Sequence, residues 1–186
     1  MGMGIRQFYA QATQRDFSRD FQLRVLEIGP NILAQSDNVY ITTATLPGYA
    51  VTNQATPFMG LQFNVPGSAT FPGSDAWVVT FRCDMNLNIR QKIANWQATI
   101  FSAFPNTPEQ STGNYAPKGM ETTAKLAVHD RDGNVVRAMK LVGVWPVIVD
   151  NIGYDQTGTG VVQTLPVTLA YQWWEPDTIS GNIIRT

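Results

Sequence analysis

The sequence has little of the chemistry from which active sites and metal centres are built. Among its 186 residues there are one cysteine, Cys83, and one histidine, His129. A single cysteine excludes an internal disulfide and a metal site made of several cysteines. A Ser-His-Asp triad would have to use His129, and no nucleophile-elbow motif accompanies it. We therefore predict no catalytic residue, no cofactor and no bound metal, and we expect that the protein is not an enzyme.

Charge is also scarce. Charged residues make up 15% of the chain and the net charge is -1, whereas about 25% is typical of soluble proteins. The lack of a basic excess argues against tight nucleic-acid binding through phosphate neutralisation. Two interpretations of the low charge remain open: an ordinary β-rich domain with a neutral surface, or a surface largely covered by other copies or partners.

Long apolar runs are missing as well. No stretch approaches the roughly 20 apolar residues that a membrane-spanning helix needs. The N-terminal residues lack the apolar core of a signal peptide. We expect a soluble chain with no membrane partner and no visible export signal.

What the sequence does contain is alternation of apolar and polar residues, which is typical of half-buried strands. At 186 residues the chain is predicted to form one domain. We interpret His129 as a surface residue next to a turn at 130–134, and Cys83 as a buried, unreactive thiol on the apolar face of a strand. The predicted strands are 21–28, 39–46, 75–83, 121–130, 135–144 continuing after Trp145-Pro146 as 147–154, and 161–175, the last being unusually long.

Residues 49–65 are predicted to form a β-hairpin with arms at 49–52 and 58–65 and a tip at 53–57. No charged residue occurs between positions 48 and 70. Exposed sheet edges normally carry lysine or another guard against edge-to-edge pairing. We therefore favour a hairpin that pairs with another molecule, the alternative being a hairpin buried inside its own fold.

One helix is predicted, over about residues 87–103. Ile89, Ile93, Trp96 and Ile100 recur at steps of four, three and four, which is one stripe of an amphipathic helix. Asn86 or Asn88 is expected to cap its start. The predicted fold class is mainly β: two packed antiparallel sheets or a partly open barrel, with this helix at one end or edge.

Trp173 and Trp174 are adjacent in the last predicted strand. Neighbouring strand residues point to opposite faces, so one tryptophan is expected in the core and the other at solvent or at a partner. Burial of the outer one under the loop at 105–120 is the alternative.

Taken in order, several segments resemble the tail tube proteins of contractile-tailed, T-even-like bacteriophages. They are similar to that family's hairpin segment, its strand-then-helix unit and its C-terminal hairpin, and together they span roughly residues 20–175. The loop at 105–120 and the tail at 176–186 depart from the pattern, and the hairpin carries less charge than is usual in the family. The matching segments are 58–67 (FMGLQFNVPG), 77–80 (WVVT), 88–97 (NIRQKIANWQ), 142–146 (VGVWP), 163–170 (QTLPVTLA) and 173–175 (WWE).

The resemblance implies a structural virion protein whose sheets join edge to edge into hexameric rings with a continuous inner β-barrel. Stacked rings would form the inner tail tube through which DNA is ejected into the host, after assembly in the host cytoplasm. Closure would leave no exposed strand edge, and it would account for the charge-poor hairpin and the long last strand. The implied partners are other copies of the chain, the sheath, baseplate, terminator and tape measure proteins, and viral DNA in the lumen without specific binding.

The resemblance also implies a single tail-tube domain over 1–186, with an N-terminal arm at 1–20, a β-barrel core at 21–175 and an extension at 176–186. The hairpin is expected to form the contact between subunits and to line the bore. Alternatives are a tube initiator or adaptor of the same fold, the tube of a bacterial injection or secretion system, and, in a different class, a carbohydrate-binding β-sandwich. The predicted interface residues are Tyr49, Val51, Phe58, Met59, Leu61, Phe63, Trp145 and Trp174.

Overall fold

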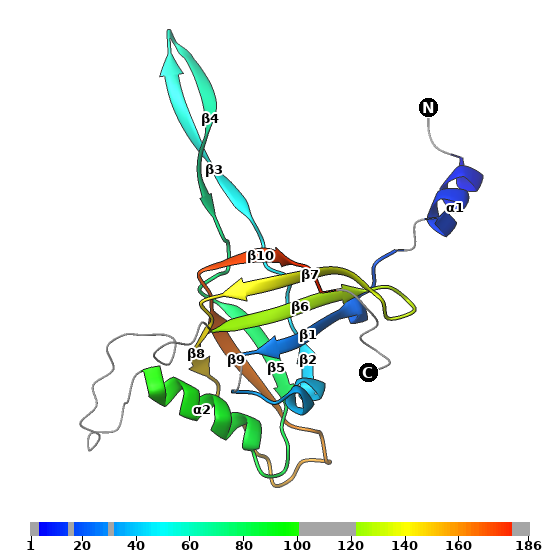
Figure 1. The fold of residues 1–186 in the computed structure, drawn as a ribbon, viewed down its shortest axis with the longest axis vertical. Coiled ribbons are helices and arrows are strands. Elements are labelled where there is room, and N and C mark those ends of the chain that lie inside the picture. Colours follow the sequence, from blue (N-terminus) through cyan, green and yellow to red (C-terminus); the bar gives the residue numbers. More distant parts are fainter. Residues whose placement is uncertain (1–3, 15–16, 30–31, 101–121, 180–186) are drawn as a thin grey trace.

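The body of the protein consists of two four-stranded antiparallel sheets packed against each other (Figure 1). The structure is a computed structural model, and it describes residues 4–14, 17–29, 32–100 and 122–179. Sheet A has the order β1 (Leu23–Ile28), β6 (Thr123–His129), β7 (Val135–Val142), β10 (Trp173–Asp177). Sheet B has the order β2 (Ile41–Thr43), β5 (Trp77–Arg82), β9 (Thr164–Ala170), β8 (Trp145–Val149).

The prediction of a mainly β fold with packed antiparallel sheets is therefore confirmed. Strand β5 shows why the sequence folds this way. Its alternate residues Trp77, Val79 and Phe81 are almost completely buried between the sheets, while Val78 and Arg82 are exposed. This is the period-2 burial that the sequence predicted for the segment.

Helix α2 (Asn88–Ile100) matches the predicted helix over the described residues, and Ile89, Ile93 and Trp96 are buried as expected. Positions 101–103 of the prediction, and the whole loop at 105–120, lie outside the described residues. The predicted asparagine cap is wrong. The carboxylate of Asp84 accepts a hydrogen bond from the Asn88 backbone N–H at 3.1 Å, and so satisfies one of the unpaired donors at the helix start.

Two strand predictions near the C-terminus are wrong in the same way. The run at 161–175 is not one long strand: β9 in sheet B ends at Ala170, and β10 begins in sheet A at Trp173. Likewise, β7 leaves sheet A at Gly143, whose φ is 68°, and β8 begins in sheet B at Trp145. Both segments turn a corner between crossing sheets, so no ring is needed to account for their length.

The N-terminal third also departs from the prediction. The strand expected from Phe21 begins at Leu23, because residues Asp20–Gln22 form the 3₁₀ turn η1, in which the Gln22 side chain accepts a bond from the Arg19 N–H at 2.7 Å. Of the strand expected at 39–46, only Ile41–Thr43 forms a strand, and its first two residues, 39 and 40, belong to the 3₁₀ helix η2 (Gln35–Tyr40). The arm contains a helix, α1 (Ile5–Gln14), with no buried residue (Figure 1).

The prediction that His129 is a surface residue is wrong, since only 5% of it is exposed. His129 lines a small hollow at the end of β6. The same hollow is lined by Phe17, Ser18 and Gln22, which precede β1 in the sequence. The turn after it is confirmed: Gly133 has a φ of 87°, and the Asp130 N–H donates to the Asn134 carbonyl at 2.9 Å.

Candidate assembly surfaces

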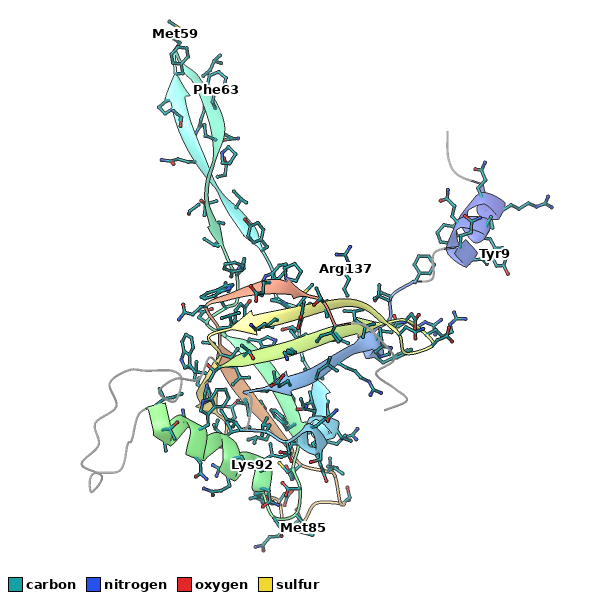
Figure 2. The ribbon with its side chains drawn as sticks, in the orientation of Figure 1. Tyr9, Met59, Phe63, Met85, Lys92 and Arg137 are labelled. Atoms are coloured by element: carbon teal, nitrogen blue, oxygen red, sulfur yellow. The ribbon has the colours of Figure 1, made fainter. Side chains whose placement is uncertain are left out.

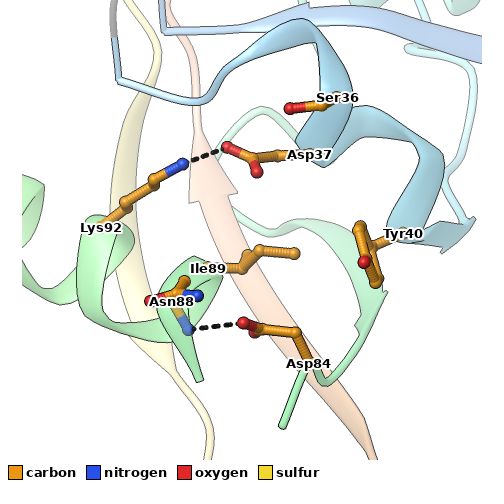
Figure 3. A pocket seen from close by; sticks show the side chains of 7 residues that line it. All are labelled: Ser36, Asp37, Tyr40, Asp84, Asn88, Ile89 and Lys92. Atoms are coloured by element: carbon orange, nitrogen blue, oxygen red, sulfur yellow. Dashed lines mark hydrogen bonds and ion pairs between the residues drawn. The ribbon is translucent and has the colours of Figure 1, made fainter. Parts of the chain in front are cut away.

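One hollow in the described part of the chain belongs to its internal support. It has a volume of about 260 Å³ and lies between η2 and the start of α2 (Figure 3). Lys92 forms an ion pair with Asp37 at 2.6 Å across it, and Asp84 caps α2 at its floor. These charged groups hold the helix against η2. The hollow is lined by Ser36, Asp37, Tyr40, Asp84, Asn88, Ile89 and Lys92.

Among the described residues, no three His, Cys, Asp or Glu side chains come together as metal ligands would. None of the helices within the same ranges has the length and apolarity to cross a membrane.

The most conspicuous surface is a hairpin of β3 (Ala50–Phe58) and β4 (Leu61–Thr70) that stands away from both sheets (Figure 1). All twenty residues from 51 to 70 are exposed. Figure 2 shows Met59 and Phe63 near its far end, remote from the body. A hairpin buried inside its own fold, the alternative that the sequence left open, is thereby excluded.

The predicted hairpin tip at 53–57 is wrong. The chain reverses at Met59 and Gly60, whose φ angles are 48° and 79°. Positive φ at both central residues gives a two-residue turn that matches the twist of the flanking strands. Pro57 lies instead inside β3, opposite Gln62.

The pairing register gives the hairpin two different faces. Phe58 and Leu61 flank the two-residue turn and form a hydrogen-bonded pair, and pairs of the two kinds alternate from there. One face is mainly apolar, and its Phe58 and Phe63 rings lie 6.4 Å apart. The apolar face carries Gln54, Thr56, Phe58, Leu61, Phe63 and Val65; the amide face carries Asn53, Ala55, Pro57, Gln62, Asn64 and Pro66.

Both prolines of the hairpin fall on non-hydrogen-bonded pairs, Pro57 with Gln62 and Pro66 with Asn53. At such pairs the backbone nitrogens point away from the partner strand, so neither proline breaks the ladder. The missing N–H groups are lost from the outer edges instead. Each outer edge consequently has a gap in its row of donors.

A bulge fixes the lower part of the hairpin, where the register shifts between Val51 and Asn53. The Thr52 hydroxyl accepts a bond from the Ser68 N–H at 2.9 Å. A Cβ on Gly67 would lie 2.6 Å from that hydroxyl oxygen. Glycine is therefore required for the close approach of β4 to Thr52.

An aromatic cluster joins the hairpin to the body. The Tyr49 and Phe71 rings lie 5.7 Å apart, and the Phe71 and Trp174 rings 6.5 Å apart. The Trp174 indole N–H donates to the Gly48 carbonyl at 2.9 Å. Trp174 thus packs half-buried at the hairpin base, and its neighbour Trp173 is 43% exposed.

The structure brings seven of the eight predicted interface residues to the hairpin or its base, namely all except Trp145, which packs half-buried on β8. Their role in subunit contacts stays a prediction. The predicted interface residues do not include Val65 and Trp173, both substantially exposed. They also include no residue of α1, whose Ile5, Phe8 and Tyr9 are exposed (Tyr9 is labelled in Figure 2); an apolar face at helical spacing was the available signal.

The outward face of sheet A carries a transverse row of charge across all four strands. The pairing register places Glu27, Lys125, Lys140 and Glu175 side by side on β1, β6, β7 and β10. Lys125 pairs with Glu27 at 3.0 Å and Lys140 with Glu175 at 3.6 Å. Each lysine is thereby neutralised by a carboxylate of the adjacent edge strand.

The outer edges of the two sheets differ in how far they are covered. Helix α2 lies along β8, and the Gln97 side chain donates to the Val147 carbonyl at 2.9 Å, which closes one edge of sheet B. The other edge of sheet B is the three-residue strand β2. In sheet A, β1 and β10 are the edges, and the Asn38 side chain donates to one carbonyl of β1, that of Leu26.

Comparison with known proteins agrees with an assembling subunit. No protein-family model matches the sequence. The chain is 30% identical to tail tube protein gp19 of Enterobacteria phage T4 over 163 residues, which are 86% of this chain and 92% of that protein.

Two solved structures share the fold. One is the tube-terminating cap of the anti-feeding prophage, with a TM-score of 0.58, 13% identity and coverage of 89% of this chain and 93% of that one. The other is from the sheath-tube complex of the PVC extracellular contractile injection system in its extended state. Its TM-score is 0.54, with 10% identity and coverage of 91% and 97% of the two chains.

Proposed function

Because the chain belongs to the family of phage tail tube proteins, we propose that six copies form a ring and that stacked rings form the inner tube of a contractile tail. The observation that carries the proposal is the hairpin. It exposes an apolar face far from the body of its own chain and carries no charge that would oppose pairing with another copy.

Sheet A is the sheet that we propose to join edge to edge between copies. Its edge strands β1 and β10 run in opposite directions, because four strands alternate in an antiparallel order. Joining β10 of one copy to β1 of the next therefore continues the antiparallel alternation around a ring. Sheet B is a poorer candidate because α2 lies along its β8 edge.

The size of such a ring decides which face points inward. Six four-stranded sheets spaced by about 4.8 Å and tilted by about 40° give a closed barrel of roughly 24 Å radius. Six copies of sheet B and α2 do not fit inside a barrel of that size together with an open channel. They therefore lie outside it, and the outward face of sheet A lines the bore.

The hairpin is proposed to lie against a neighbouring copy with its apolar face. Phe58, Leu61 and Phe63 are each at least half exposed in the single chain. Their burial in the assembly supplies a hydrophobic driving force that the single chain leaves unused. The predicted roles of Tyr49, Val51 and Met59 belong to the same contact.

The partners that follow from this role are the sheath outside the tube, the baseplate and terminator at its ends, and the tape measure protein and DNA within it. A second candidate is an adaptor or terminating ring of the same fold, favoured by the likeness to a tube-terminating cap. Copy number per virion separates the two, since a tube needs many rings and an adaptor one or two.

Electron microscopy of the purified protein tests the proposal, with rings or tubes as the expected result. The matched variant replaces residues 55–64 by Asn-Gly, which keeps the hydrogen-bonded pair Gln54–Val65 next to the new two-residue turn. It should remain a folded monomer that forms no tubes. Tubes of normal appearance from this variant would contradict the hairpin assignment.

Hydrogen exchange tests the edges. Amides of β1 and β10 should gain protection when monomers become tubes, while those of β8 should not. The reverse pattern would show that sheet B joins the copies.

A further inference from the structure

The charged row on sheet A places two lysines next to each other, and the glutamates at its two ends compensate their repulsion. Lys125 and Lys140 are direct cross-strand partners, and like charges in that position are destabilising. Glu27 and Glu175 flank them on the edge strands and form ion pairs with them. The row therefore reads acid, base, base, acid across the sheet, with no net charge.

The remainder of this face repeats the balance. Arg24 on β1 and Asp177 on β10 lie on the same side of the sheet, at the ends of the row that contains Ala127 and Ala138. Three cations thus face three carboxylates. Arg137 is three positions from Lys140 and therefore belongs to the opposite side of β7. Figure 2 shows it projecting from that strand.

We propose that this face is a charge-paired bore wall, built to let a polyanion slide past without being held or repelled. The proposal rests on the ring described above. The occupant to which it commits is duplex nucleic acid, recognised only as a run of phosphates. What goes beyond the tube function is the mechanism, in which cations are present in the bore but are already neutralised within each subunit.

The pairing avoids two effects that would hinder sliding, namely binding of the phosphates and their repulsion. A phosphate that approaches Lys125 or Lys140 must displace a carboxylate that the fold already holds beside it, so little counterion release is gained. A bore lined only by carboxylates would instead repel the DNA throughout its passage. Paired charges in a narrow aqueous channel avoid both effects.

Removing the carboxylates should turn the wall into a binding surface. The variant E27Q/E175Q keeps the shape of both side chains and removes the negative charge beside Lys125 and Lys140 in every copy. We expect its tubes to retain about tenfold more short duplex DNA than wild-type tubes at about 50 mM salt, in nuclease-resistant form, and to release it at about 200 mM.

The control is D132N/D155N, which makes the same change in net charge at two exposed turn residues outside the four strands. Its tubes should retain no more DNA than wild-type tubes. Equal retention by the control and by E27Q/E175Q would overturn the proposal, as would wild-type levels in E27Q/E175Q. Electron microscopy of the same samples checks the ring itself: tubes without the DNA effect refute only the charge-paired wall, and absence of tubes from wild-type protein refutes both.

A labelling experiment tests where the face lies, independently of DNA. In a C83S background, a cysteine at Lys125 (K125C) should react with a bulky polymer maleimide in the monomer and be protected in the tube. Met85, which is 97% exposed on the loop before α2, supplies the control M85C, which should react in both states (Figure 2). Equal reaction of K125C in tubes and monomers would place the face outside the bore.

Discussion

The apolar face of the hairpin offers a test that separates folding from assembly. Phe58 and Phe63 are 61% and 50% exposed in the single chain, and the body does not cover them. Replacing both by serine should change the free energy of unfolding of the monomer by no more than about 0.5 kcal/mol, as is usual for exposed sites.

The same change should weaken assembly strongly. Complete burial of a phenylalanine side chain is worth about 1.5–3 kcal/mol, and roughly half of each ring remains to be buried. The two rings together then contribute about 2–3 kcal/mol per copy, which raises the critical concentration for tube formation by roughly 30- to 150-fold.

Pelleting of tubes over a concentration series measures the critical concentration. Denaturant unfolding of the unassembled protein measures the free energy of unfolding. The matched control is Q62S/N64S, two serine substitutions on the amide face of the same hairpin. F58L/F63L should assemble nearly normally, because it retains the apolar surface. An unchanged critical concentration for F58S/F63S, or an equal loss in Q62S/N64S, would refute the assignment of the faces.

Four further predictions concern other parts of the chain. Trp96→Ala, which empties a buried site on α2, should lower the free energy of unfolding by about 3–5 kcal/mol in urea titrations. Burial, followed by the negative charge of Asp84, raises the pKa of the Cys83 thiol; less thiolate is then present at a given pH, so iodoacetamide should label it more slowly than free cysteine, and unfolding should abolish the difference. Gly67→Ala forces a Cβ against Thr52 and should impair tube formation while leaving monomer unfolding unchanged, with Ser68→Ala as a milder comparison. Because residues 38–74 carry no charge, raising sodium chloride should leave the critical concentration nearly constant and sulfate should lower it.

The sequence predicted the elements in which one periodic signal dominates. β5 alternates with period 2, and α2 places Ile89, Ile93 and Trp96 on one buried stripe. In both, the same side chains that form the pattern also form the core. The exposed hairpin was likewise predictable. Charged residues normally protect an exposed strand edge from pairing, and the sequence has none between positions 48 and 70.

The errors arose where local patterns do not contain the deciding contact. Alternation continues from β9 into β10, although the two strands belong to different sheets. The corner depends on Tyr171, whose N–H donates to the Ser74 carbonyl at 2.8 Å, a bond between segments nearly a hundred positions apart. The hairpin tip was misplaced because Pro57 is a strong turn signal, while its position on a non-hydrogen-bonded pair is a property of the register.

That position of the prolines bears on how a chain with such a hairpin stays soluble before it assembles. A long, uncharged, exposed hairpin with an apolar face is a template for indiscriminate edge-to-edge pairing. Pro57 and Pro66 lie on different strands, and each removes one outward N–H group without weakening the ladder inside the hairpin. Continuous pairing along either outer edge is therefore interrupted, while the apolar side chains remain available to a partner that offers a fitting surface. Contacts through the face are thus favoured over contacts through the edges, which is the preference required of a subunit that must add to an ordered ring instead of to a fibre.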